Sequence, residues 1–108
     1  MTLEIDPLTL KAKFFRRFAD PTRLSIIECL RRGEKAVGEI VSETRQAQPN
    51  VSNHLGCLRD CGLVKTRRDG KNVLYSLSNG KIKTFLLETD RLLSVVYEEI
   101  YRCTRYKE

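Results

Sequence analysis

A single β-hairpin signal stands in a chain whose other segments have helical patterns. Asp69-Gly70 lies between two runs, residues 63–68 and 72–78, in which apolar and polar residues alternate. An Asp-Gly pair between such runs is a strong indication of a tight hairpin. The chain is therefore expected to be mainly α-helical with one small β element.

Four helices are expected before the hairpin, over about residues 7–19, 21–33, 37–44 and 49–61. Asp20-Pro21 is a helix-start signal, because aspartate caps a helix and proline suits its first position. Val51, Leu55 and Leu58 fall on one face of the fourth helix. This spacing predicts that the fourth helix is anchored on the core.

A last helix is expected over about residues 81–103. Its stripe recurs at nearly 3.5-residue spacing and comprises Ile82, Phe85, Thr89, Leu93 (or Leu92), Val96, Ile100 and Cys103. A chain of 108 residues cannot easily cover so much apolar surface, which favours dimerisation through the terminal helices. The alternative is that this helix folds back onto the core of its own chain.

The order of the elements is helix, helix, helix, helix, hairpin, helix, which is that of a winged helix-turn-helix. The length allows one domain, residues 1–108. Within it, residues 49–61 are interpreted as the reading helix, about 63–78 as the wing and about 81–103 as the dimer helix. The predicted fold class is mainly α with a small β-hairpin wing.

The formal net charge of +6 and the pI near 9.4 favour a polyanionic partner. Asparagine and glutamine can read adenine edges, arginine can read guanine, and basic wing residues hold phosphates. The candidate DNA-contacting residues are Gln48, Asn50, Ser52, Asn53, His54, Arg59, Arg67, Arg68 and Lys71. The alternatives are a solvated basic hairpin and an interaction module that does not bind DNA.

Other classes of protein are disfavoured. No apolar run approaches the roughly 18 residues of a membrane span, and the short acidic start of the chain does not resemble a signal peptide. We therefore expect a cytoplasmic protein, in which the four cysteines indicate metal or redox chemistry. One histidine, no phosphate-binding glycine loop and no base paired with a nucleophile argue against an enzyme, and we expect no organic cofactor.

Two cysteines, Cys57 and Cys61, lie four residues apart in the reading helix. That spacing is about one turn, so both thiols project from the same side, away from the face that anchors the helix. Together they can bind one soft cation but leave its coordination incomplete. Cys29, beside Leu30 in an apolar helix, is interpreted as a small buried residue.

Several linked segments resemble one known family. They are Ala19-Asp20-Pro21-Thr22-Arg23-Leu24, Val51-Ser52-Asn53-His54-Leu55 with Leu58-Arg59, Gly62-Leu63-Val64 and Val73-Leu74-Tyr75-Ser76-Leu77. They resemble the ArsR/SmtB metalloregulatory repressors over about residues 8 to 103. The resemblance implies a homodimeric winged-helix repressor that leaves its operator when an inducer binds. A two-fold dimer in turn implies an inverted-repeat operator.

The inducer site differs between branches of that family. Residues 35–39 lack the Cys-x-Cys pattern of one branch, and a single histidine, His54, excludes the final-helix Asp and His ligands of another. Cys57, Cys61 and Cys103 match the CmtR-type cadmium/lead sensors. Three thiolates suit Cd(II) or Pb(II), and also As(III), whereas Zn(II) would need His54, water or a carboxylate as well.

The chain departs from the family at the turn before the reading helix, and a rival inducer chemistry stays open. Arg45 stands where many relatives have a glycine, and Ala47 where a capping Ser or Thr is usual, which predicts a weakly held helix start. The rival is a thiol-redox or persulfide-responsive repressor that uses Cys29 and Cys103, although Cys29 is one position off the pattern of the sulfide-responsive relatives.

Overall fold

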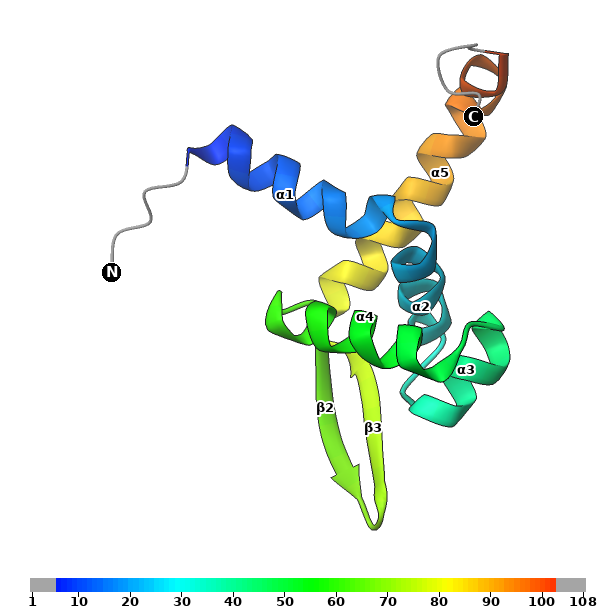
Figure 1. The fold of residues 1–108 in the computed structure, drawn as a ribbon. Coiled ribbons are helices and arrows are strands. Elements are labelled where there is room, and N and C mark those ends of the chain that lie inside the picture. The colour runs from blue at the N-terminus through cyan, green and yellow to red at the C-terminus, as the bar shows by residue number, and fades with distance from the viewer. Residues whose placement is uncertain (1–5, 103–108) are drawn as a thin grey trace. The chain divides into compact units, whose positions relative to one another are not determined.

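The computed structural model describes residues 6–102 and divides into two compact units after Ser78. The first unit contains α1 (Pro7–Ala19), α2 (Pro21–Arg31), β1 (Lys35–Ala36), α3 (Val37–Thr44), α4 (Gln48–Asp60), β2 (Val64–Asp69) and β3 (Asn72–Leu77) (Figure 1). The second unit contains α5 (Gly80–Arg102). The mainly α fold with a small β element is confirmed.

The bounds of α1 and α3 coincide with the predicted ranges, whereas the reading helix is shifted by one residue. It was expected over 49–61 and is observed as Gln48–Asp60. Ala47 is its N-cap, since the amide of Val51 donates to the Ala47 carbonyl at 3.1 Å. At the other end, Cys61 is the C-cap and lies outside the helix, whereas the prediction included it as the last helical residue.

The sheet has one strand more than expected. Its order is β1-β3-β2, all antiparallel, and β1 is a two-residue strand paired with Leu74 and Tyr75 of β3. Two residues are too few for an alternating pattern to be visible in the sequence. The turn also moves by one residue: Asp69 pairs with Asn72, so that Gly70 and Lys71 form the loop.

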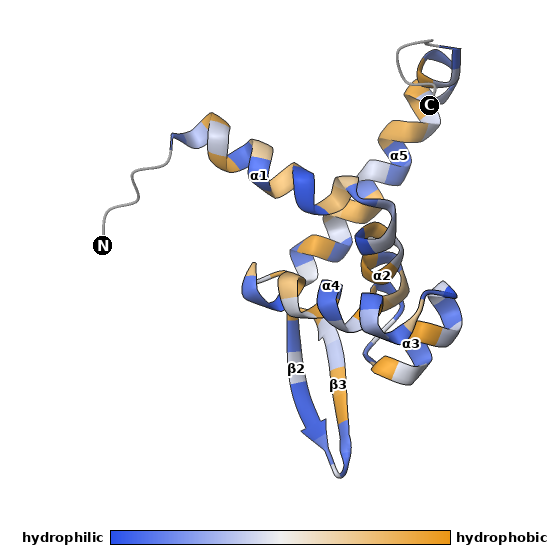
Figure 2. Cartoon of the chain, viewed as in Figure 1, coloured by the Kyte–Doolittle hydropathy of each residue, from blue (hydrophilic) through white to orange (hydrophobic). Residues whose placement is uncertain are grey.

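The core of the first unit lies among α2, α3 and α4. Its largest fully buried side chains are Ile26, Ile27, Ile40, Val51, Leu55 and Leu58. Burial of each such side chain contributes roughly 1.5–3 kcal/mol. Val51, Leu55 and Leu58 are each 0% exposed, which confirms that they anchor α4. In Figure 2 the apolar colour is concentrated along α2, whereas β2 is largely hydrophilic.

The C-terminal end of α1 is hydrogen-bonded to α2. Asp20 caps α2 by accepting from the amide of Arg23 at 2.9 Å, and the Arg23 guanidinium donates to the carbonyls of Arg16 and Arg17. Of the apolar stripe of α1, only Phe18 is buried; Leu10, Phe14 and Phe15 are exposed. These side chains of α1 thus keep exposed apolar surface in a single chain.

Helix α5 also carries exposed apolar side chains along its length. They are Leu87, Leu92, Leu93, Val95, Tyr97, Ile100 and Tyr101. The rings of Tyr97 and Tyr101 stack at 5.9 Å between centroids. Over residues 6–102, no helix is both long and apolar enough to cross a membrane.

Candidate functional site

The turn between α3 and α4 holds the start of the reading helix with few interactions. Arg45 adopts the left-handed conformation (φ 57°, ψ 28°) as the C-cap of α3. That conformation costs a non-glycine residue about 1–2 kcal/mol. Ala47 makes no side-chain capping hydrogen bond to α4. Both observations agree with the weakly held helix start expected from these two residues.

The surface of α4 opposite its buried face is polar and open to solvent. Exposed side chains on it include the predicted DNA contacts Gln48, Asn50, Ser52, Asn53 and Arg59. His54 is only half-buried and lies near Asp20. The pKa of Asp20 is lowered chiefly by the hydrogen bond from the Arg23 amide, with smaller contributions from the charges of Arg23 and His54. His54 therefore lies in the vicinity of the residue that caps α2.

The wing exposes the predicted contacts Arg67, Arg68 and Lys71. Arg67, however, forms an ion pair within the chain. Its guanidinium binds both carboxylate oxygens of Glu34, with the Nε to Oε2 distance at 2.9 Å. This pair lowers the pKa of Glu34 and raises that of Arg67. Glu34 was not singled out in the sequence, because the two residues are 33 positions apart.

The end of α4 is a Schellman turn. Gly62 has φ +78°, its amide donates to the Arg59 carbonyl at 3.0 Å, and the Leu63 amide donates to the Leu58 carbonyl at 3.0 Å. The apolar contact typical of this turn is provided by buried Leu58 and Leu63. The hydroxyl of Ser78 donates to the Gly62 carbonyl at 2.6 Å. Cys61 is thereby held at a defined position between the helix and the wing.

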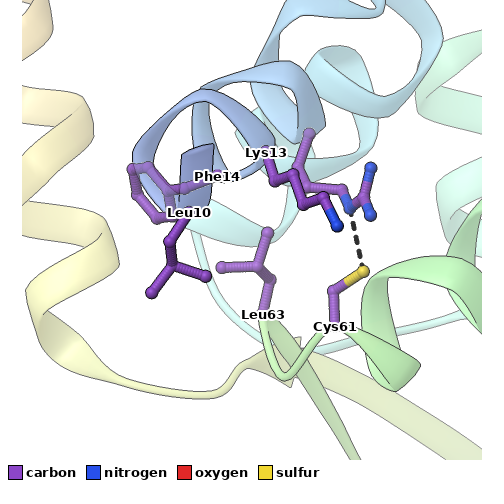
Figure 3. Close-up of a pocket in the computed structure, with 6 residues that line it drawn as sticks. Leu10, Lys13, Phe14, Cys61 and Leu63 are labelled. Atoms are coloured by element: carbon purple, nitrogen blue, oxygen red, sulfur yellow. Dashed lines mark hydrogen bonds between the residues drawn. The ribbon is translucent and has the colours of Figure 1, made fainter. Parts of the chain in front are cut away.

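The thiol pair lies away from the buried face of α4, as predicted: Cys57 is half-buried and Cys61 is exposed. The Nε of Arg17 in α1 donates a hydrogen bond to the Cys61 sulfur at 2.9 Å (Figure 3). An open pocket of about 330 Å³ adjoins this contact. It is lined by Leu10, Lys13, Phe14, Arg17, Cys61 and Leu63. Nothing in the sequence near either residue indicated the contact between Arg17 and Cys61.

Of the three predicted metal ligands, the structure describes Cys57 and Cys61. Cys103, the third predicted ligand, lies outside the described residues. Over residues 6–102, no group of three or more His, Cys, Asp or Glu side chains is placed to hold a metal ion. Cys57 and Cys61 are two soft donors one helical turn apart, a set that suits a soft cation provided that a further ligand is supplied.

Cys29 has a different environment from the thiol pair. It is 3% exposed, and its thiol donates a hydrogen bond to Oε2 of Glu43 at 2.6 Å. Burial, followed by the hydrogen bond and the charge of Glu43, raises the pKa of Cys29 to about 11. Arg32 binds the same carboxylate oxygen at 3.3 Å. The interpretation of Cys29 as a small buried residue is confirmed.

Comparison with known proteins gives a consistent result. Residues 20–66, from the cap of α2 into β2, match the family model for bacterial regulatory proteins of the arsR family. A probable mercury resistance operon repressor from Streptomyces lividans is 40% identical over 94 residues, which are 87% of this chain and 75% of that protein. The regulator CmtR from Mycobacterium bovis is 36% identical over 85 residues, 79% of this chain and 72% of that protein.

A solved structure is similar to this chain in its fold as well. It is the homodimeric winged helix-turn-helix DNA-binding domain of a possible ArsR-family transcriptional regulator from Mycobacterium bovis. It is 25% identical with a TM-score of 0.71, and the match covers 90% of this chain and 95% of that one. The winged helix-turn-helix architecture is confirmed, and the relatives are transcriptional regulators rather than enzymes. This chain belongs to the arsR family of bacterial DNA-binding transcriptional regulators.

Proposed function

We propose that residues 1–108 act as one winged helix-turn-helix domain of a homodimeric repressor that leaves its operator when a soft metal ion binds. The observation that carries this proposal is that Cys57 lies in α4 and Cys61 at its C-cap, beside an exposed surface of α4 that is polar and suited to DNA. The similarity to a mercury resistance operon repressor supports a metal as the inducer.

In the proposed complex with DNA, α4 lies in the major groove and the wing lies along the backbone. Exposed Asn50 and Asn53 are suited to adenine edges and Arg59 to guanine, while Arg68 and Lys71 hold phosphates. Arg67 exchanges the carboxylate of Glu34 for a phosphate.

The proposed dimer uses the terminal helices. Leu8, Leu10 and Phe15 of α1 are exposed in the single chain, as are Leu87, Leu92 and Leu93 of α5. Exposed apolar surface of this extent favours a second copy of the chain as its cover. A homodimer is the state of the related domain from Mycobacterium bovis. Two-fold symmetry then requires an inverted-repeat operator, with half-sites about one or two helical turns apart.

The proposed inducer site consists of Cys57, Cys61 and Cys103. Three thiolates favour Cd(II) or Pb(II) and accept As(III), whereas Zn(II) requires a further ligand to complete its tetrahedron. Binding displaces the thiol protons, so that affinity for the metal falls as the pH falls. A divalent ion with three thiolates carries a net charge of about −1 beside the DNA-binding surface, which opposes phosphate binding.

The coupling that this proposal requires is modest. A loss of 5–150-fold in operator affinity corresponds to about 1–3 kcal/mol of coupling free energy between the two sites. Either repulsion of phosphate by the metal site or a constraint on α4 needs to supply only that much free energy.

The experiment that tests the proposal is a Cd(II) titration of the reduced, metal-free protein, followed by near-ultraviolet thiolate-to-metal absorption. We expect saturation at one ion per subunit, with absorption diminished in Cys103→Ser and in Cys61→Ser. The same samples, with fluorescently labelled operator, should lose anisotropy as Cd(II) is added. Absence of thiolate absorption in the wild type, or of operator release, would contradict the metal proposal.

The rival inducer chemistry is less well supported. A disulfide or polysulfide bridge between Cys29 and Cys103 requires a reactive Cys29 thiolate. Burial and the carboxylate of Glu43 oppose that thiolate by raising the pKa of Cys29 to about 11.

A further inference from the structure

One side-chain contact connects α1 with the thiol pair. The Nε of Arg17 donates to the sulfur of Cys61 at 2.9 Å, although the residues are 44 positions apart. The dashed line to the Cys61 sulfur in Figure 3 marks this hydrogen bond. Arg17 comes from the last turn of α1, and Cys61 is the C-cap of α4. The contact therefore joins a proposed dimer helix to the proposed inducer site.

Each partner in this contact is held by other interactions. The Schellman turn fixes Cys61 through the hydrogen bonds of Gly62 and Leu63. The last turn of α1 is fixed by the Nε of Arg23, which donates to the Arg17 carbonyl at 3.2 Å. Arg17 is itself half-buried. Both residues of the contact are thus attached to backbone that is itself hydrogen-bonded.

The chemistry of the contact suits an outer-shell role in a thiolate site. A sulfur that binds a metal keeps lone pairs, and an N–H directed at it orients the ligand. A guanidinium also offsets part of the negative charge of a site with three thiolates. Loss of an outer-shell partner typically weakens metal affinity 10–100-fold.

We propose that Arg17 is a positioning residue of the inducer site: it holds the Cys61 sulfur before metal binds, remains its outer-shell donor afterwards, and links the site to α1. This inference rests on the proposed function and names a part of its regulation. Arg17 contacts the ligand atom and is not itself a metal ligand.

The test compares Arg17→Met with Arg16→Met. Methionine keeps an apolar stem but removes the charge and every N–H, and Arg16 is the exposed neighbour on the same helix turn. Cd(II) affinity is measured by competition with a chelator, using thiolate-to-metal absorption. We expect Arg17→Met to bind Cd(II) 10–100-fold more weakly and Arg16→Met to stay within about threefold of the wild type.

Two further readouts separate positioning from general stability. In the metal-free protein, the ¹⁵Nε–¹H resonance of Arg17 should move in Cys61→Ala and stay in Cys57→Ala. In the metal-bound protein, the ¹¹³Cd resonance should move in Arg17→Met and stay in Arg16→Met. Thermal melts of both variants identify any loss of folding, and Arg17→Lys, which keeps the charge, should recover part of the affinity.

The outcomes distinguish this inference from the proposed function. If wild type binds Cd(II) through thiolates and Arg17→Met behaves as Arg16→Met does, the role of Arg17 is wrong and the metal repressor stands. If the wild type shows no thiolate absorption, both are overturned. An Arg17 resonance that ignores Cys61→Ala would also overturn the inference, whatever the metal affinities are.

Discussion

Cys29 and Cys61 occupy opposite environments in the same small unit. Cys29 is a buried residue of α2, and its thiol donates to the carboxylate of Glu43 in α3. Cys61 is exposed at the end of α4, and its sulfur accepts a hydrogen bond from the guanidinium of Arg17. One sulfur thus acts as a donor to an anion, and the other as an acceptor from a cation.

The difference teaches that burial first, and the neighbouring charged group second, set what a cysteine can do. A carboxylate and burial keep Cys29 in its protonated, unreactive form. An open position and an N–H donor leave the lone pairs of Cys61 available to a soft electrophile or metal. The comparison separates a packing cysteine from a candidate ligand.

The largest expected difference between the two cysteines is in alkylation. With Glu43 and burial raising the pKa of Cys29 to about 11, only about one Cys29 thiol in a thousand is ionised at pH 8. The rise of its pKa from 9.0 to about 11 lowers the thiolate fraction of Cys29 roughly a hundredfold. Iodoacetamide on the reduced protein should therefore label exposed Cys61 faster than buried Cys29 by a factor on the order of a hundred. Peptide mass spectrometry over time measures both rates, and the difference should vanish in urea. Comparable rates in the folded protein would break the comparison.

The next effect concerns the response to the inducer. Cys61→Ser should abolish the 5–150-fold loss of operator affinity that Cd(II) causes, because it removes a proposed ligand. Cys29→Ala should keep that response, because Cys29 takes no part in the metal site. Anisotropy of labelled operator, with and without Cd(II), measures both variants. A response lost in Cys29→Ala and kept in Cys61→Ser would favour the redox reading instead.

A smaller effect is the pH dependence of stability. The folded-state pKa of Cys29 is raised from 9.0 to about 11, so its contribution is complete below pH 9 and is lost as the pH rises towards 11. Between pH 8 and pH 10, wild type should lose roughly 1 kcal/mol more unfolding free energy than Cys29→Ala. Urea unfolding at the two pH values gives this difference. Equal losses of unfolding free energy in the two proteins would show that folding does not raise the pKa of Cys29.

The smallest effect isolates the carboxylate from burial. Glu43→Gln removes the charge beside Cys29 but leaves the thiol buried, so the pKa of Cys29 should fall without reaching its ordinary value. Alkylation of Cys29 should then accelerate several-fold, roughly tenfold at most. Glu88→Gln on α5 serves as the control. An unchanged rate in Glu43→Gln would assign the protection of Cys29 to burial alone.

Local signals account for the parts of this fold that the sequence predicted. Asp20-Pro21 opens α2 with a capping carboxylate, and Gly62 supplies the left-handed residue that ends α4. The spacing of Val51, Leu55 and Leu58 selected the buried face of α4, because an apolar stripe at helical spacing has only one way to reach a core. The same helical spacing predicted that Cys57 and Cys61 lie outside this buried face.

The tertiary structure alone decided the partners of the charged and sulfur-bearing side chains. Arg17 meets Cys61 across 44 positions, Arg67 meets Glu34 across 33, and Cys29 meets Glu43 across 14. Such pairs leave no periodicity or spacing in the sequence, since each arises only when packed elements bring distant residues together. The sequence by itself determined the helices and the hairpin, the buried face of α4 and the family, but not strand β1. Packing determined that the Cys29 thiol is buried beside a carboxylate and that the Cys61 thiol is exposed beside an arginine.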